Sequence, residues 1–442
     1  MKPLPSLEGA TVVMVGMARS GSAAIRLLRE KGASVRAVDE KLTGKLEGIP
    51  ILPQRAASLE GADLIVISPG VPVDLPLLSE FRARGIAVIG ELELASFFLQ
   101  GDTIGITGSN GKTTTTALTG HILREAGLAC QVGGNIGTPP TAMIATSQAG
   151  QWNVLELSSF QLETVDTFHA RIGAALNVTP DHLDRHHTFE QYAAAKGHLF
   201  TTQRPGDYAI LNADDPTCVS YAALTPATPV WFSSSRPVDH GLFLEGETIR
   251  LDGEPLMQAS AIPLRGRHNI ENTMAAAAAA HLAGAGLAEI AAAVRTFPGV
   301  EHRLELVRQV QGVDYYNDSK ATNVDATLKA LDAFPAGLWI ILGGKDKDSD
   351  YTLLRDALGK KARAALLIGA AAEKIAEQID GAVPWTNCGT LEAAVHCASA
   401  QAQPGEVVLL APACASFDQF ENFEHRGRVF KAIVSRIEQR SR

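Results

Sequence analysis

The sequence predicts an α/β protein with three domains, in which helices cover mostly parallel sheets. Two observations support this prediction. The chain has 442 residues, which is too long for one hydrophobic core and suits two to four domains. An apolar strand, a turn of small residues and a helical stretch also follow one another repeatedly, which is typical of parallel α/β architecture. We expect the domains to span residues 1–99, 100–299 and 300–442.

The first block of the chain has the spacing of a nucleotide-binding strand–turn–helix unit. A strand at 11–15 runs into Gly16, Ala18 and Gly21, and the next strand ends at Asp39, 18 positions after the last glycine. Ala18 stands where a dinucleotide fingerprint has the glycine that lets the backbone approach a pyrophosphate. The pattern therefore indicates a Rossmann-like domain that binds some nucleotide, rather than NAD in particular. A tight turn without a ligand is the alternative.

The second block opens with TIGITGSNGKTTTT, residues 103–116, which predicts a phosphate-binding loop. A standard Walker A motif would have glycine at position 106, where Ile106 stands, so this loop is shorter. Glycines let backbone N–H groups converge on phosphate oxygens, and the following helix adds its positive end. We expect Lys112 to reach the outer phosphates and Thr113 to ligate Mg²⁺. The block thus predicts a P-loop ATPase-type parallel sheet, with a glycine-rich turn carrying a surface lysine as the alternative.

Further polar residues follow two later strands of this block. Glu156 lies near the end of an apolar strand, where an unpaired acid is costly to bury, so we expect a cation beside it. A strand predicted at 174–178 is followed by two aspartates and three histidines within residues 181–187. The order of these residues is not the HExxH of zinc proteases. The residues alone indicate one histidine as a ligand or base, with the others solvated, and leave Lys196 as an ordinary surface lysine.

The third block alternates strands and helices again, from LWIILGG through AALLIGAA to GEVVLLAPACASFDQF, and predicts a second Rossmann-like domain.

The net charge of −9 argues against non-specific binding of nucleic acid, which needs a basic face. The longest uncharged window, NTMAAAAAAHLAGAGLA, is typical of a packed helix rather than a membrane span. With no signal-peptide pattern at the start, we expect a cytoplasmic protein that binds neither nucleic acid nor membrane.

Seven segments, in order along nearly the whole chain, resemble the motifs of the Mur ligases, the ATP-dependent amide-forming enzymes of peptidoglycan synthesis. They are TGSNGKTTT, GGNIGTP, LELSSFQLE, NVTPDHLDRHHTFEQYAAAK, RGRHNIEN, GVEHRLE and NDSKATN. The resemblance implies a monomeric cytoplasmic ligase that joins UDP-N-acetylmuramoyl-L-alanine to D-glutamate. ATP would phosphorylate the carboxylate, and the amine would then attack the acyl phosphate. The alternatives are another Mur-type or folylpolyglutamate-type ligase, an NAD-dependent oxidoreductase and a nucleotide-binding module without catalysis.

The resemblance also implies roles for individual residues. Binding of ATP is implied for Gly108, Ser109, Asn110, Gly111, Lys112, Thr113, Thr114, Asn269, Asn272, Arg303 and Asp318. Two Mg²⁺ ions would be bound by Thr113, Glu156, His182 and Lys196, the last of these carbamylated by CO₂. The uridine nucleotide would contact Arg19, Ser20, Asp39, Ser68, Gly70 and Asn135. D-Glutamate would contact Thr322, Lys347, Ser416 and Phe423. Catalysis would depend on Lys112, Lys196, His182, Lys320 and Lys347.

Overall fold

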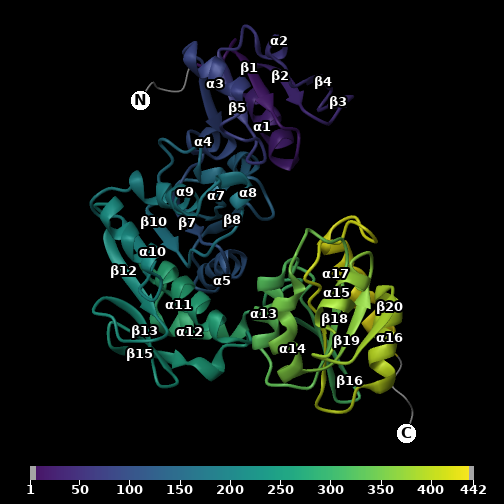
Figure 1. Ribbon diagram of the computed structural model, residues 1–442. Coiled ribbons are helices and arrows are strands. Elements are labelled where there is room, and N and C mark those ends of the chain that lie inside the picture. The colour runs from purple at the N-terminus through teal and green to yellow at the C-terminus, as the bar shows by residue number, and fades with distance from the viewer. Residues whose placement is uncertain (1–5, 438–442) are drawn as a thin grey trace. The chain divides into compact units, whose positions relative to one another are not determined.

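The computed structural model describes residues 6–437 and contains three sheets flanked by helices (Figure 1). By their internal contacts the residues form two compact units. The first unit holds the chain up to residue 262 together with 270–297, and the second holds 263–269 and the chain from 298 onward. Two of the three sheets lie in the first unit. The predicted α/β class is confirmed.

The N-terminal sheet has the strand order β3-β4-β2-β1-β5-β6. All pairings are parallel except that of β3 with β4. The strands are β1 Thr11–Val15, β2 Ser34–Asp39, β3 Lys45–Leu46, β4 Ile49–Pro53, β5 Leu64–Ile67 and β6 Ala87–Gly90, and the helices are α1 Arg19–Glu30, α2 Ala56–Leu59 and α3 Pro76–Ala83. The chain moves outward from β1 to β4 on one side and resumes at β5 on the other. In such sheets ligands bind beyond the carboxyl ends of the two strands at this reversal.

The central sheet has nine strands in the order β15-β14-β13-β12-β11-β10-β7-β9-β8. It is parallel from β8 to β13, and β14 and β15 add an antiparallel edge. The strands are β7 Asp102–Thr107, β8 Cys130–Gly134, β9 Trp152–Glu156, β10 Ile172–Ala175, β11 Tyr208–Asn212, β12 Thr228–Ser233, β13 Gly241–Glu245, β14 Thr248–Leu251 and β15 Glu254–Gln258. The phosphate-loop strand β7 thus lies between β9 and β10, away from either edge.

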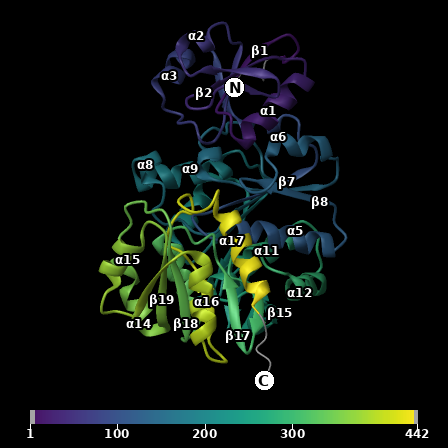
Figure 2. The same cartoon turned by 90° about the vertical axis from the view of Figure 1, so that its right-hand side faces the viewer.

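Helices of different lengths connect these strands, and α5 and α9 are two of the longer ones (Figure 2). They are α4 Glu91–Ser96, α5 Lys112–Glu125, α6 Pro140–Met143, α7 Ser159–Leu162, α8 Leu183–His186, α9 Phe189–Thr201, α10 Pro216–Ser220, α11 Arg267–Leu282 and α12 Leu287–Thr296. The alanine-rich window lies in α11, where Met274–Ala280 are at most 1% exposed. The prediction of a packed helix there is confirmed. No helix among residues 6–437 is long and apolar enough to span a membrane.

The strand predicted at 174–178 is shifted in the structure, because β10 ends at Ala175. Beyond that point the chain leaves the sheet to support the phosphate loop. Asn177 accepts a hydrogen bond from the backbone N–H of Ser109 on its carbonyl oxygen and another from Asn110 on Oδ1, over 2.8 Å each. The apolar residues of this segment predicted a strand that continues to residue 178. The contacts of Asn177 with the phosphate loop instead end the strand at Ala175.

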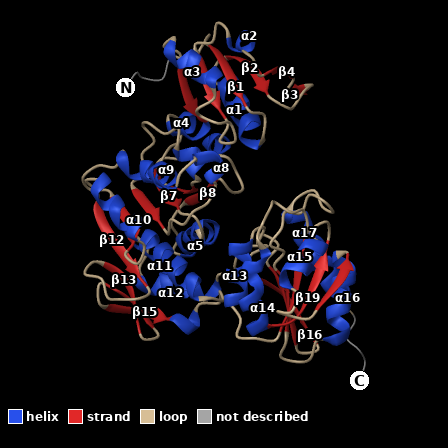
Figure 3. Cartoon of the chain, viewed as in Figure 1, coloured by secondary structure: helices blue, strands red, loops and turns tan. Residues whose placement is uncertain are grey.

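The C-terminal sheet has the order β16-β17-β21-β18-β19-β20, with only β16 antiparallel. Its strands are β16 Glu305–Val310, β17 Val313–Asn317, β18 Leu338–Gly343, β19 Ala362–Ile368, β20 Trp385–Gly389 and β21 Val407–Leu410. The helices α13 Val324–Asp332, α14 Arg355–Lys361 and α15 Ala372–Ile379 pack on one face, while α16 Leu391–Gln401 and α17 Phe423–Arg436 pack on the other (Figure 3). Helices on both faces of a mostly parallel sheet agree with the prediction of a second Rossmann-like domain.

Candidate active site

The phosphate loop joins the end of β7 to the start of α5. Gly108 and Gly111 have φ angles of 148° and 87°, which residues with a side chain rarely adopt. Lys112, the first residue of α5, turns back over the loop and donates from Nζ to the carbonyl oxygens of Gly108 and Ser109, over 2.8 and 2.9 Å. The backbone N–H groups of Ser109 and Asn110 point to Asn177, so in this structure they hold the loop itself. Sequence reasoning did not identify that asparagine.

Lys196 lies beside the same loop, although it comes from the middle of α9. Its side chain is 1% exposed, and Nζ donates to the carbonyl oxygen of Gly108 over 2.8 Å and lies 4.4 Å from the ring centroid of Tyr192. Burial, together with the nearby charge of Lys112, holds the pKa of Lys196 well below its usual value. This shift favours the neutral form of the amine, which is the nucleophilic form. The residues alone favoured a surface lysine at this position, and that reading is wrong.

Glu156 is placed by the register of β9, in which it pairs with Ile106, two residues before the loop. It is 2% exposed, and its Oε1 accepts a hydrogen bond of 2.9 Å from the side-chain amide of Asn135. Its other oxygen, Oε2, is buried and has no hydrogen-bond partner among the described residues. The residues fit Mg²⁺ because this ion is commonly bound by one or two carboxylates and the oxygens of a nucleotide. Thr113 lies in the first turn of α5 and is also buried.

The three histidines after β10 have different surroundings. His182 adopts a positive φ of 53° and is half exposed, with its ring centroid 4.9 Å from that of Phe160. His186 is buried between Ser159 and Glu163, and this burial lowers its pKa. His187 is exposed. The expectation that all but one of these histidines are solvated is therefore wrong for His186, whereas His182 remains open to bind a ligand.

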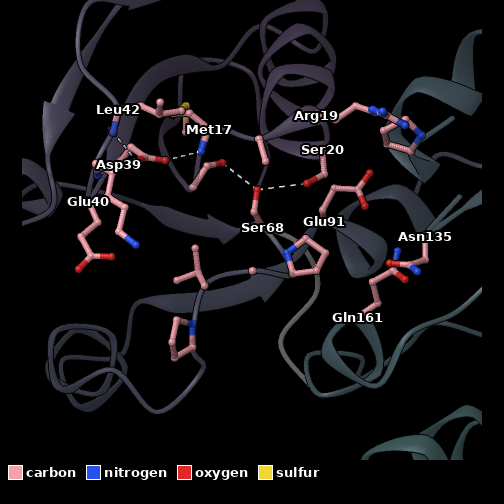
Figure 4. A pocket seen from close by; sticks show the side chains of 18 of the residues that line it. Met17, Arg19, Ser20, Asp39, Glu40, Leu42, Ser68, Glu91, Asn135 and Gln161 are labelled. Atoms are coloured by element: carbon pink, nitrogen blue, oxygen red, sulfur yellow. Dashed lines mark hydrogen bonds between the residues drawn. The ribbon is translucent and has the colours of Figure 1, made fainter. Parts of the chain in front are cut away.

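The residues predicted to bind the nucleotide sugar line one pocket of about 860 Å³, at the carboxyl ends of β1 and β5 (Figure 4). The structure brings together Arg19, Ser20, Asp39, Ser68, Gly70 and Asn135. The pocket is bounded by residues of both the N-terminal and the central sheet regions of the first unit, and Arg19 links them by donating to the carbonyl oxygen of Gly137 over 3.2 Å. The strand order places this pocket at the topological reversal of the N-terminal sheet, where a nucleotide is expected.

Asp39 and Ser68 shape the floor of this pocket. Oδ2 of Asp39 accepts from the backbone N–H of Met17 over 2.7 Å, and Oδ1 accepts from those of Lys41 and Leu42 over 2.8 Å each. Burial raises the pKa of Asp39, but these three backbone hydrogen bonds outweigh burial and hold that pKa below its usual value. Ser68 donates to the carbonyl oxygen of Gly16 over 2.7 Å. The turn after β1 is thus held on one side by Asp39, at the end of β2, and on the other by Ser68, directly after β5.

Glu91 and Gln161 are among the residues that line the pocket and were not predicted as site residues from the sequence. Glu91 is the first residue of α4 and is 1% exposed. Gln161 closes a capping box with Ser158 at the start of α7. The only available indication in the sequence was the pair of acids in GELELA, where an apolar helix begins with glutamate.

In the second unit, Asp318 and Lys320 follow directly after β17. Asp318 is 8% exposed, and burial raises its pKa to about 7 although Arg303 opposes that rise. Nζ of Lys320 lies 4.1 Å from the ring centroid of Phe423, whose carbonyl oxygen accepts from Ser319 over 2.8 Å. The unit therefore gathers these predicted ATP-binding and D-glutamate-binding residues near one end of β17.

The remaining predicted residues are placed as follows. Thr322 donates its backbone N–H to the carbonyl oxygen of Lys320 over 2.8 Å, Ser416 is 2% exposed and Lys347 is exposed. Asn269 belongs to the second unit, where its side-chain amide donates to the carbonyl oxygen of Arg265 over 2.6 Å. Asn272 belongs to the first unit, and a Cβ on Gly111 would come within 2.2 Å of its Oδ1. Asn272 therefore packs directly on the phosphate loop.

The described residues contain no group of three or more histidine, cysteine, aspartate or glutamate side chains arranged to hold a metal ion. Oxygen ligands of other kinds also bind Mg²⁺ in proteins. The Thr113 hydroxyl and the phosphate oxygens of a bound nucleotide are of this kind.

Comparison with known proteins agrees along the whole chain. The family models for the Mur ligase MurD-like N-terminal domain, the Mur ligase middle domain and the Mur ligase glutamate ligase domain match residues 10–90, 106–280 and 302–414. A UDP-N-acetylmuramoylalanine–D-glutamate ligase of Solibacter usitatus is 64% identical over 98% of this chain and 99% of its own. Another, of Acidobacterium capsulatum, is 50% identical over 97% of this chain and 96% of its own.

Solved structures agree in fold. UDP-N-acetylmuramate-alanine ligase MurC of Thermotoga maritima has a TM-score of 0.62 at 17% identity, covering 96% of this chain and 99% of that one. A pseudomurein peptide ligase type C of Methanothermus fervidus has a TM-score of 0.61 at 19% identity, covering 97% and 100%. The chain therefore belongs to the Mur ligase family, and its N-terminal domain is of the MurD-like type, as the matched domains and the two relatives show.

Proposed function

We propose that the protein is an ATP-dependent ligase that forms the amide bond between UDP-N-acetylmuramoyl-L-alanine and D-glutamate, giving ADP and phosphate in peptidoglycan precursor synthesis. The observation that carries this proposal is the convergence of Lys112, Lys196 and Glu156 on one phosphate loop, with a nucleotide-sized pocket in the same unit. The names of the two relatives at 64% and 50% identity support the same reaction.

ATP is proposed to lie with its phosphates against the loop and the first turn of α5. The start of a 14-residue helix offers backbone N–H groups and the positive end of its dipole to these anions. Thr113 and Glu156 would hold Mg²⁺ there, and the buried, unpartnered Oε2 of Glu156 supports this assignment. A bound Mg²⁺ supplies positive charge that offsets the charge of the phosphates. The adenosine part is assigned to Asn269, Asn272, Arg303 and Asp318.

The first chemical step transfers a phosphoryl group. A carboxylate oxygen of the L-alanyl group attacks the γ-phosphorus of ATP, the bond to the β–γ bridging oxygen breaks and ADP leaves. Lys112 stabilises the transferred group because its ammonium lies over the loop on which the outer phosphates rest. The product is an acyl phosphate, whose phosphate is a far better leaving group than the oxide of a free carboxylate.

In the second step, the amine of D-glutamate attacks the acyl carbon, loses a proton, and the bond from carbon to the phosphate oxygen breaks. The chain's main contribution is to align the reactants and to compensate their charge. We assign His182 and Lys196 to the region of the acyl group, with Lys196 carbamylated so that it could help to bind a second Mg²⁺. Thr322, Lys347, Ser416 and Phe423 are assigned to D-glutamate, and Lys320 to the phosphates.

The nucleotide sugar is proposed to bind in the pocket of about 860 Å³, with its diphosphate near Arg19 and Asn135. The turn between β1 and α1 supports this orientation, since α1 begins at Arg19 and has no acidic residue in its first turn.

We propose a cytoplasmic location and a monomer, because the substrates are small soluble molecules and each predicted role is filled from one chain. Domain assignments follow the ranges 1–99, 100–299 and 300–442.

The experiment that tests this proposal is the amino-acid dependence of ATP cleavage. Purified protein is incubated with ATP, Mg²⁺ and UDP-N-acetylmuramoyl-L-alanine, and released phosphate is measured with D-glutamate, L-glutamate, L-lysine or meso-diaminopimelate. We expect phosphate release only with the nucleotide sugar and D-glutamate together. Equal turnover with L-lysine or meso-diaminopimelate contradicts the proposed substrate, and turnover with a folate in place of the nucleotide sugar supports the folylpolyglutamate-type alternative.

A further inference from the structure

Glu91 occupies an unusual position in the nucleotide-sugar pocket. Its side chain is 1% exposed and lines the pocket, and its Oε2 has no hydrogen-bond partner among the described residues. Figure 4 shows the carboxyl group of Glu91 among the labelled side chains of the pocket, with Ser20 and Arg19 on one side and Asn135 and Gln161 on the other. A buried polar atom without a partner costs stability unless a ligand supplies that partner.

The other oxygen of Glu91 is fully engaged. Oε1 accepts from the backbone N–H of Thr141 over 2.8 Å and from the hydroxyl of the same residue over 2.5 Å. These two bonds fix the carboxyl group to the first residues of α6. Because both donors come to Oε1, a proton on the carboxyl group belongs on Oε2, the oxygen without a hydrogen-bond partner among the described residues.

The elements that pack against α4 leave this carboxyl group without a cation in direct contact. They are β5, β6, α1, α6 and α7. Of these, α6, α7, β5 and β6 contain no ionisable residue. From α1, Arg19 reaches the pocket, but it donates to the carbonyl oxygen of Gly137. Burial accordingly raises the pKa of Glu91 to about 7, although the bonds from Thr141 oppose that rise.

The proposed ligand is itself an anion. A nucleotide sugar has a diphosphate esterified at both ends, so it keeps its negative charge throughout the neutral range. A carboxylate at Glu91 would repel this group, whereas a carboxylic acid offers an O–H donor to one of its oxygens. The same pocket already contains Asp39, whose pKa is below its usual value and which is satisfied by three backbone N–H groups. Asp39 and Glu91 therefore differ in environment: Asp39 accepts backbone hydrogen bonds on both oxygens, whereas Oε2 of Glu91 has no hydrogen-bond partner among the described residues.

We propose that Glu91 binds the nucleotide sugar as a neutral acid, donating a hydrogen bond from Oε2 to the ligand, so that binding is accompanied by uptake of a proton. This inference rests on the proposed function, because it takes UDP-N-acetylmuramoyl-L-alanine as the ligand. It assigns a specificity residue to the pocket: an O–H donor at this position discriminates for ligands that present an acceptor there.

Glu93, two residues along the same helix, provides a matched control. It is equally buried, at 1% exposed, but it does not line the pocket. Both of its oxygens are engaged: Oε2 accepts from the backbone N–H groups of Asp166 and Phe168 over 3.0 Å each, and Oε1 accepts from the backbone N–H and hydroxyl of Thr167. Glu93 thus has the burial and the structural role of Glu91 without an unpartnered oxygen.

The first experiment is isothermal titration of the unmodified protein with UDP-N-acetylmuramoyl-L-alanine, without ATP, in buffers of different ionisation enthalpy. At pH 8 the free protein carries mostly ionised Glu91, and we expect uptake of about one proton per ligand bound. At pH 6 the residue is already protonated, and uptake falls to about a tenth of a proton. The dissociation constant rises about tenfold between the two pH values. Equal affinity and no proton uptake at either pH overturns the inference.

The second experiment repeats the titration with the variants E91Q and E93Q. Glutamine at position 91 keeps an acceptor for Thr141 and places a permanent N–H donor where Oε2 lies. E91Q is expected to bind at pH 8 about tenfold more tightly than the unmodified protein, with no proton uptake and no pH dependence. E93Q is expected to lower the melting temperature and to keep the proton uptake. A folded E91Q that binds more weakly at every pH shows that the carboxylate itself is needed, and also overturns the inference.

Failure of the inference and failure of the proposed function have different outcomes. If the nucleotide sugar does not bind at either pH, the proposed function fails. If it binds and supports ATP cleavage with D-glutamate but takes up no proton, only the role of Glu91 fails. Should E91Q not fold, the proton uptake of the unmodified protein still decides the question.

Discussion

Lys112 and Lys196 donate to the same atom, the carbonyl oxygen of Gly108, over 2.8 Å each. One lysine starts the helix after the phosphate loop, and the other comes from α9, 84 positions later in the chain. Two charged amines that lie close together repel each other, and burial adds the cost of removing their charges from water. Burial and the positive charge of Lys112 both lower the pKa of Lys196, which favours the neutral form of its amine.

Lys112→Ala should abolish turnover, because the transferring phosphoryl group loses its cationic partner. We expect a loss of about 10²-fold or more in kcat, measured as phosphate release at saturating substrates. Circular dichroism should show an intact fold, since the bonds from Lys112 to carbonyl oxygens lie within the loop itself. A near-normal rate in a folded variant would contradict the assignment.

Lys196→Ala should be inactive and should recover partly when formate or acetate is added, because a small carboxylate can replace the missing carbamate anion. The measurement is phosphate release with and without the added acid. Lys196→Met is the control for packing. Since the pKa of Lys196 is lowered in the folded state, folding disfavours its charged form, and methionine removes this cost. We therefore expect the methionine variant to be inactive without a lower melting temperature, and unchanged activity in either variant removes Lys196 from the site.

Gly111→Ala should lower both stability and ATP turnover. Gly111 has φ of 87°, and a Cβ there would come within 2.2 Å of Oδ1 of Asn272, so the loop must shift. Gly127→Ala is the matched control at the other end of α5, with φ of 72° and no atom within 4 Å of the added Cβ. The control should cost about 1 kcal/mol in unfolding free energy with full activity. Equal losses of activity in both variants would mean that strain alone explains the effect.

Asp318→Asn should change how stability depends on pH. Burial raises the pKa of Asp318 from 3.8 to about 7, so between these values the folded state binds more protons than the unfolded state. Stability is therefore lost as the pH rises from about 4 to 7. Asparagine removes this loss, and the variant should gain melting temperature over the unmodified protein at pH 8 but not at pH 4. Asp356→Asn, with a side chain 81% exposed, should show no such difference.

Binding of substrates should change the arrangement of the two compact units. The residues assigned to ATP are divided between them, with Lys112 and Asn272 in one and Arg303 and Asp318 in the other. We therefore predict that the second unit closes on the first when ligands bind, as in other enzymes that assemble a site from separate parts. Small-angle scattering with a non-hydrolysable ATP analogue and the nucleotide sugar should give a smaller radius of gyration. Identical curves with and without ligands count against closure.

Much of the fold could be predicted from local patterns. The strand at 11–15, the glycine-rich loop and the position of Glu156 at a strand end are each encoded within a few residues, and the structure agrees with all three. The strand predicted at 174–178 was wrong in its bounds because Asn177 leaves the sheet to hold the phosphate loop. Lys196 looked like a surface residue because nothing within α9 indicates that its side chain reaches Gly108.

The sequence by itself determined the α/β class, the three sheets, the phosphate loop and the family, because spacing along the chain controls turns, strand ends and recognisable motifs. Tertiary structure alone decided which distant groups share an environment. Glu91 and Glu93 are both acids on one short helix, yet Glu93 accepts hydrogen bonds on both oxygens, whereas Glu91 lines a pocket and has one buried oxygen without a partner among the described residues. Desolvation and hydrogen bonding depend on neighbours brought together by folding, and these neighbours decide whether an acid is a structural contact or a group that binds a ligand.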